Sequence, residues 1–162
     1  CPSRRQVTLE RAAQILREAG DGVLKVGVFV NPTIEEVRDA IAAAGLDYGQ
    51  LNGGEAAAVC ATVGPAAIKS FKATAAGLQP DPSTYADGPI HLEAPGTTGG
   101  SGVPWDFSLA SEIARQRPVM LSGGLDADNV AAAIATGSRR NPFAGSSCTG
   151  TARPPASSTW AG

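Results

Sequence analysis

Short apolar runs alternate along the chain with longer segments whose apolar residues recur at helical spacing. The valine-rich run VLKVGVFV, residues 23–30, has the β-branched composition of a buried strand. Further strands are predicted at 46–53, 66–73, 88–94 and 118–124. The strands start at 23, 46, 66, 88 and 118, so most intervals are 20 to 23 residues. Such intervals hold one strand and one helix, as parallel strands require, and they predict a repeated βα unit.

Capping residues support the predicted helices between these strands. The segment 7–20 opens with Thr8 as N-cap and stops at Gly20. Thr33, followed three residues later by Glu36, forms the capping-box pattern of a second helix. Further helices are predicted over 54–64, between the last two strands, and over 126–137. The chain is therefore expected to have an α/β fold.

The residues after 137 change character abruptly. Segment 138–162 is rich in Ser, Pro, Gly and Arg and has no apolar periodicity. We expect one folded domain over 1–137 and an irregular tail over 138–162, either a disordered natural tail or the product of a reading-frame slip. Because Cys1 is not an initiating Met, the chain is also expected to be a fragment.

Composition narrows the range of functions. With 43% hydrophobic and 17% charged residues and a net charge of −2, the chain resembles a soluble globular domain and lacks a basic surface for nucleic acid. No apolar run reaches the roughly 18 residues of a membrane span, so we expect a cytoplasmic protein without a membrane partner. Three cysteines and one histidine support neither a disulfide framework nor a metal site. Cys60 is interpreted as a small buried hydrophobe.

Candidate chemistry concentrates between residues 90 and 129. Glu93 closes one predicted strand, a glycine-rich loop containing Gly99 and Gly100 follows, and Gly123 and Gly124 close the next strand. In parallel α/β folds, ligands bind where the carboxyl ends of strands converge. Glycine backbone N–H groups can approach an anion closely. The pattern predicts a phosphate-sized site beside a carboxyl group.

Alternation along strand 88–94 assigns its side chains to two faces. Ile90 and Leu92 share one face, whereas His91 and Glu93 share the other, which would be the interior of a barrel with Glu93 uppermost. His91 is interpreted as a hydrogen-bonded interior residue that needs a partner. The alternative for Glu93 is a solvated carboxylate at the end of a strand.

In order along residues 2 to about 137, the chain resembles the phosphoribosylanthranilate isomerase family. The resemblance rests on these strings in sequence: SRRQVTLERAAQIL, LKVGVFVNPTIEEV, YGQLNGGE, IKSFKA, GGSGVPWDFSLA and PVMLSGGLDADNV. It implies a (β/α)8 TIM barrel, here incomplete with about five recognisable parallel strands, because a full barrel needs roughly 200 residues or more. Other phosphate-binding barrels such as sugar-phosphate epimerases are disfavoured, because they lack the ordered QLNG and GGSG strings.

The resemblance implies an Amadori rearrangement of a phosphorylated small molecule, with no redox cofactor or metal. The reaction needs a general acid at the sugar ring oxygen and a base at C2. The family's acid is an Asp at the position of Glu93, so Glu93 inherits that role with one extra methylene. A carboxyl misplaced by about 1 Å can cost about 100-fold in rate.

The substrate-binding residues follow from the same resemblance. They are Arg5 for the anthranilate carboxylate, Gln50 and Asn52 in the wall of the site, Gly99 and Gly100 in the loop above Glu93, and Gly123 and Gly124 at the phosphate. An equally weighted alternative makes Arg5 a surface arginine. Asn52 stands where the family usually has His, Gly54 where it has Asp, and Ser122 where it often has Ala.

Two family strings have no match. One carries the cysteine base at the end of the first strand, and Cys1 does not take its place. The other forms the eighth strand and completes the phosphate cradle. We therefore expect an isomerase that is impaired or inactive as this chain stands. The alternative is a noncatalytic phosphate-binding fragment, or one that self-associates through open sheet edges.

Overall fold

The computed structural model describes residues 6–74, 76–93, 108–123, 125 and 127–136. These residues form one sheet in the order β1-β2-β3-β5-β6, with β4 paired to β3. The strands are β1 (Val26–Phe29), β2 (Tyr48–Leu51), β3 (Ala67–Thr74), β4 (Gly77–Gln79), β5 (Ile90–Glu93) and β6 (Val119–Ser122). All neighbours on the main path are parallel. The five predicted strands are confirmed, each within a few residues of its expected bounds.

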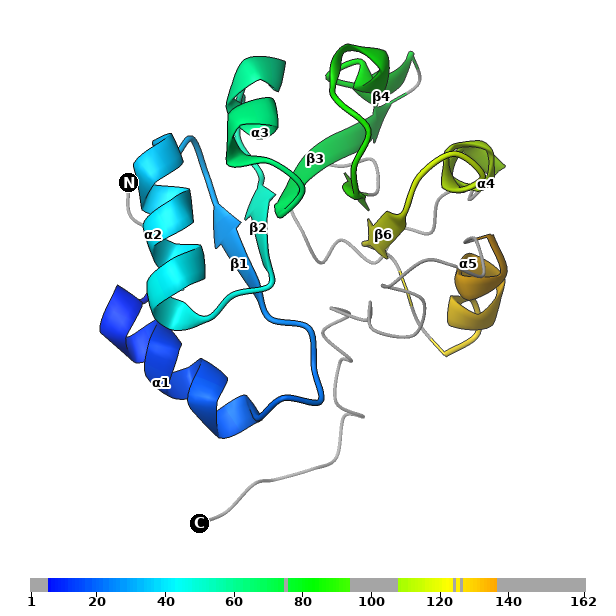
Figure 1. Cartoon of the computed structure of the whole chain (residues 1–162). Helices are drawn as coiled ribbons and strands as arrows, with labels where there is room; N and C mark the ends of the chain where they lie inside the picture. The colour runs from blue at the N-terminus through cyan, green and yellow to red at the C-terminus, as the bar shows by residue number, and fades with distance from the viewer. Residues whose placement is uncertain (1–5, 75, 94–107, 124, 126, 137–162) are drawn as a thin grey trace.

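Helices connect most of the parallel strands. They are α1 (Leu9–Ala19), α2 (Ile34–Ala44), α3 (Ala57–Val63), α4 (Ser108–Ala114) and α5 (Val130–Thr136), with a 3-10 turn η1 (Pro82–Thr84). Figure 1 shows the helices along the outer side of a curved row of strands. None of the helices in the described part of the chain is long and apolar enough to cross a membrane.

The predicted helix caps are present. The Thr8 side chain accepts a hydrogen bond from the backbone of Arg11. Thr33 and Glu36 form both bonds of the capping box. Each cap satisfies N–H groups that have no partner within the helix. Short local patterns therefore determine where α1 and α2 begin.

The connection from β3 to β5 differs from the predicted βα unit. Residues after Thr74 turn back at Gly77 (φ 107°) and form the antiparallel strand β4. Besides β4, the described part of this connection contains the 3-10 turn η1 and no α-helix. The three-residue strand is too short to show a hydrophobic period, so the sequence pattern did not predict it.

The hydrophobic core lies between the sheet and the helices. One cluster joins β3, β5 and β6 to α4 and α5 through Phe71, Ile90, Leu92, Val119 and Leu121 together with Ala110, Ala114 and Ala133. A second cluster joins Val37 of α2 and Cys60 of α3 to Leu51 and Ala67. The opposite face of the sheet therefore carries the residues that alternate with these, including His91 and Glu93. Because the helices cover the outer side of the curved sheet, His91 and Glu93 lie on its concave side (Figure 1).

Candidate functional site

Glu93 ends β5 on the concave face of the sheet. Its Cα pairs with that of Lys72 on β3 and with that of Ser122 on β6. The side chain is half-buried, and no hydrogen bond or ion pair joins it to another described residue. The expected position of Glu93 above His91 is therefore the one observed. A carboxyl group is available here at the carboxyl end of three adjacent parallel strands.

Gly123 follows Ser122 directly and has a φ of 87°. Side chains disfavour this conformation, so the turn after β6 depends on glycine. Because Ser122 pairs with Glu93, the turn begins beside the carboxyl group. Of the other predicted contacts, Arg5, Gly99, Gly100 and Gly124 lie outside the described residues.

Below Glu93, His91 is the centre of a buried polar cluster. Its Nδ1 lies 2.9 Å from Ser70 Oγ and 3.4 Å from Gln50 Nε2. Its Nε2 lies 2.6 Å from Ser122 Oγ. The imidazole is only 5% exposed. The partner that a buried histidine requires is thus present on both sides of the ring.

Asn52 completes this cluster at the end of β2. Its Oδ1 accepts a hydrogen bond from Gln50 Nε2 at 2.8 Å and another, shorter one from Ser70 Oγ. Gln50 is buried, whereas Asn52 is half-buried. The structure therefore brings the predicted wall residues Gln50 and Asn52 together with His91.

Ser70 was not singled out in the sequence. Its position on β3 shares the face of His91, but that relation depends on the pairing of β3 with β5. Local alternation does not reveal which residues of two strands lie opposite each other. Strand register is set by the whole fold.

Burial keeps the His91 imidazole neutral. Desolvation lowers its pKa from 6.5 to about 4. A neutral ring has one donor and one acceptor nitrogen, which matches a position between two hydroxyl groups. His91 is therefore a neutral hydrogen-bonding residue near pH 7.

A buried ion pair braces the loop between β2 and α3. Lys69 Nζ lies 2.9 Å from Glu55 Oε2 and also donates to the carbonyl oxygens of Leu51 and Gly53. Glu55 Oε1 accepts from the backbone N–H groups of Asn31 and Gly53. Burial alone would raise the pKa of Glu55, but these hydrogen bonds together hold it below its usual value. The pair ties the loops after β1 and β2 to β3.

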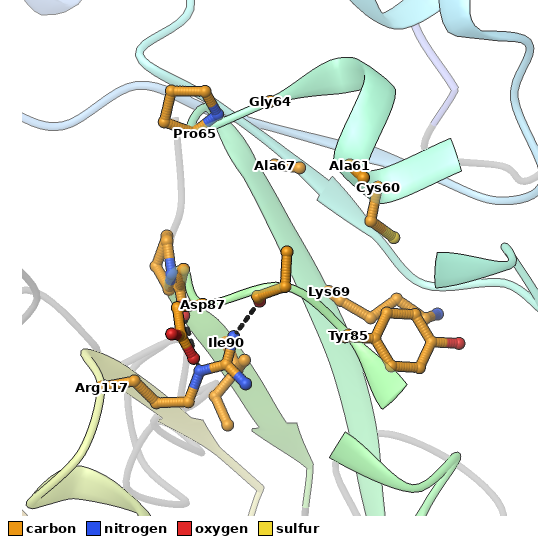
Figure 2. Close-up of a pocket in the computed structure, with 13 residues that line it drawn as sticks. Cys60, Ala61, Gly64, Pro65, Ala67, Lys69, Tyr85, Asp87, Ile90 and Arg117 are labelled. Atoms are coloured by element: carbon orange, nitrogen blue, oxygen red, sulfur yellow. Dashed lines mark hydrogen bonds between the residues drawn. The ribbon is translucent and has the colours of Figure 1, made fainter. Parts of the chain in front are cut away.

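A cavity of about 260 Å³ lies on the other flank of the sheet, between α3 and the segment before β5. Figure 2 shows Lys69, Tyr85 and Arg117 around it. Two of its charged side chains are engaged elsewhere, because Lys69 binds Glu55 and Arg117 donates to the carbonyls of Gly88 and Ala86, while Asp87 also lines the cavity. The cavity is separate from Glu93 and Gly123.

Cys60 lines that same cavity and packs in the helix-facing core. Burial raises the pKa of its thiol. The interpretation of Cys60 as a small buried hydrophobe is confirmed. The described residues contain no cluster of three or more His, Cys, Asp or Glu side chains that could hold a metal ion.

Comparison with known proteins identifies the family. The family model for N-(5'phosphoribosyl)anthranilate (PRA) isomerase matches residues 2–145. The chain belongs to the phosphoribosylanthranilate isomerase family. An N-(5'-phosphoribosyl)anthranilate isomerase of Syntrophomonas wolfei is 40% identical over 139 residues, covering 82% of this chain and 66% of the relative. The chain thus spans about two thirds of the length of this relative.

Solved structures of the family share the fold. The phosphoribosyl anthranilate isomerase of Thermus thermophilus superposes with a TM-score of 0.67 at 31% identity, covering 83% of this chain and 67% of the other. Another family structure, in complex with reduced 1-(o-carboxyphenylamino)-1-deoxyribulose 5-phosphate, has a TM-score of 0.60 at 26% identity, covering 83% and 66%. The prediction of a partial (β/α)8 barrel is confirmed.

Proposed function

We propose that the chain carries the acid and phosphate side of an isomerase site for N-(5-phosphoribosyl)anthranilate, in tryptophan biosynthesis. The product of this Amadori rearrangement is 1-(2-carboxyphenylamino)-1-deoxyribulose 5-phosphate. One observation carries the proposal: Glu93 pairs with Ser122, and the next residue, Gly123, turns with a positive φ. A sugar phosphate can contact a carboxyl group and a backbone N–H turn at the same time when the two are neighbours.

In this proposal Glu93 acts as general acid. It donates its proton to the ring oxygen of the phosphoribosyl amine while the C1–O bond breaks and the nitrogen lone pair forms the C=N bond. A base then removes the C2 proton, and the enolamine rearranges to the ketone. Such proton transfers typically contribute about 10² to 10⁴ in rate.

We assign the base to no described residue, and the family string that carries the cysteine base has no match in this chain. Cys60 does not serve, because it is buried on the helix-facing side of the sheet and burial raises its thiol pKa. A thiol with a raised pKa is a poor source of thiolate. We therefore expect turnover by this chain to be slow and to depend on Glu93.

The test follows the fluorescence of phosphoribosylanthranilate mixed with the purified chain. We expect a loss faster than the buffer rate, and we expect Glu93→Gln to return it to the buffer rate. Glu35→Gln, at an exposed position in the first turn of α2, is the matched control and keeps the rate. Turnover that survives Glu93→Gln would refute the acid role.

A second candidate is a noncatalytic fragment that binds phosphate and self-associates. It is favoured by β1, which ends the described sheet: Val28 within this strand is 62% exposed, and Val30 just after it is 69% exposed. Exposed strand edges pair readily with other strands. The reduced product analogue is reduced 1-(o-carboxyphenylamino)-1-deoxyribulose 5-phosphate, the ligand of the family structure described above. Binding of this analogue without turnover would support this candidate. Sedimentation as a compact monomer at all concentrations would count against self-association, whereas dimers abolished by Val28→Lys would support it.

A further inference from the structure

In the cluster around His91, the Ser70 hydroxyl can donate its hydrogen to only one acceptor. Ser70 Oγ has two close partners, Asn52 Oδ1 and His91 Nδ1. A serine hydroxyl donates only one hydrogen, and an amide oxygen can only accept. The hydrogen of Ser70 therefore points to Asn52, with the amide oriented as in the structure.

The direction of the remaining bonds follows from this one. His91 Nδ1 lies 2.9 Å from Ser70 Oγ and must donate to it, so Nδ1 carries the ring proton. His91 Nε2 is then bare and accepts from Ser122 Oγ at 2.6 Å. Gln50 Nε2 lies 3.4 Å from Nδ1 and is itself a donor, so this contact cannot be a hydrogen bond when Nδ1 carries the proton.

We propose that His91 is a positioning residue whose Nδ1-protonated ring directs a single hydrogen-bond chain from Ser122 through Ser70 to Asn52. The chain joins the turn after β6 to the end of β2 beneath Glu93. It acts on substrate only through the residues at its two ends.

The consequence for ligand recognition lies at Asn52. Its Oδ1 accepts from both Ser70 and Gln50, so the group left for a ligand is the Nδ2 amide. Asn52 is half-buried at the carboxyl end of β2 and can reach a ligand there. Asn52 is thus a donor to an accepting oxygen of the substrate, a specificity role that rests on the proposed function.

The single histidine of the chain makes the direction measurable. Nitrogen-15 NMR of the full chain near pH 7 should show one imidazole with a protonated Nδ1 and an unprotonated Nε2. An Nε2-protonated ring would overturn the proposal, because the chain of bonds would then run in the opposite direction and Asn52 would present its carbonyl oxygen.

The Ser70→Ala variant provides a second test of the hydrogen-bond chain. Without Ser70, Nδ1 loses its acceptor and Gln50 becomes its nearest donor, so the tautomer should shift toward protonated Nε2. Thr62→Ala removes an exposed hydroxyl of α3 and should leave the tautomer unchanged. A Ser70→Ala protein with the same tautomer as the parent chain would overturn the proposal.

These measurements need no turnover, so they separate this proposal from the proposed function. If the protein shows the Nδ1-protonated ring but no isomerase activity, the positioning role of His91 stands and the proposed function fails.

The ligand role of Asn52 is tested by titrating the protein with the reduced product analogue. We expect the Asn52 side-chain NH2 signals, assigned by their loss in Asn52→Asp, to shift more than those of Gln50. Saturation of Glu93 and Gly123 signals with unmoved Asn52 signals would overturn the donor role.

Discussion

His91 Nε2 lies 2.6 Å from Ser122 Oγ. This contact joins β5, which ends in Glu93, to β6, which leads into Gly123. The strands that carry the carboxyl group and the turn are therefore held together by a partly buried hydrogen bond as well as by strand pairing. In the neutral, Nδ1-protonated imidazole Nε2 accepts from Ser122, whereas a protonated Nε2 would have to donate to it.

Acid should weaken the fold through His91. The ring has a pKa of about 4 in the folded chain, against 6.5 for an ordinary histidine. Between these values the unfolded chain binds more protons, so stability falls as the pH drops from 6.5 to about 4 and His91 adds no further loss below that. The difference between the two pKa values corresponds to a loss of about 3 kcal/mol in the free energy of unfolding. Chemical denaturation at a series of pH values measures it.

The comparison for this prediction is His91→Gln, which removes the chain's one imidazole. Other groups, including Glu55 with its lowered pKa, also lose stability in acid and remain in the variant. The difference in unfolding free energy between the parent protein and His91→Gln should therefore shrink as the pH falls from 6.5 to about 4. A difference that stays constant from pH 7 to pH 4 would contradict the assignment.

Shortening the acid should raise turnover. If Glu93 acts in a site suited to a shorter carboxylate, Glu93→Asp withdraws the carboxyl by about 1 Å and increases the rate by up to about 100-fold. The assay is the loss of substrate fluorescence, with Glu93→Gln as the inactive reference. A Glu93→Asp chain slower than the parent would show that the strand is placed for glutamate.

The turn after β6 should bind the ligand phosphate. Gly123→Ala forces a side chain onto a residue with a φ of 87°, which costs about 1 to 2 kcal/mol in backbone strain. Gly64→Ala is the matched control, because Gly64 has a φ of 90° but ends α3 away from Glu93. Both variants should lose similar stability, and only Gly123→Ala should lose affinity for the reduced product analogue in calorimetric titration. Equal affinities would remove Gly123 from the phosphate site.

The ion pair between Lys69 and Glu55 should matter for stability. Glu55→Gln leaves the buried Lys69 ammonium without its counter-charge, and breaking such pairs typically costs about 3 to 5 kcal/mol. Asp21→Asn breaks a 3.8 Å pair between a fully exposed carboxylate and the half-buried Lys25, and it should change the unfolding free energy little. Denaturant titration of both variants decides the matter. Equal changes in unfolding free energy would mean that the pair between Lys69 and Glu55 does not stabilise the fold more than an ordinary surface pair.

The sequence predicts the parallel strands and the capped helices because those signals are local. The valine-rich run of β1 and the capping box of Thr33 and Glu36 are readable within a few residues. The β4 hairpin is too short for such a signal. The placement of Glu93 and His91 on one face also follows from alternation.

The contacts of the site were less accessible to sequence reasoning. Ser70 meets His91 across a strand pair, and Lys69 meets Glu55 across 14 positions of chain. Both contacts depend on strand register and loop geometry, which cannot be inferred from a short segment of sequence. The sequence therefore indicates which residues are polar on the concave face, and the fold determines their partners.

The most direct test of the account is a crystal structure of the chain with the reduced product analogue, reduced 1-(o-carboxyphenylamino)-1-deoxyribulose 5-phosphate. We predict that the ligand phosphate lies on the backbone N–H groups at Gly123 and that the Glu93 carboxylate contacts the hydroxyl derived from the sugar ring oxygen. A ligand bound in the cavity beside Cys60 and Arg117, or at the sheet with Glu93 turned away from that hydroxyl, would contradict the proposed isomerase site.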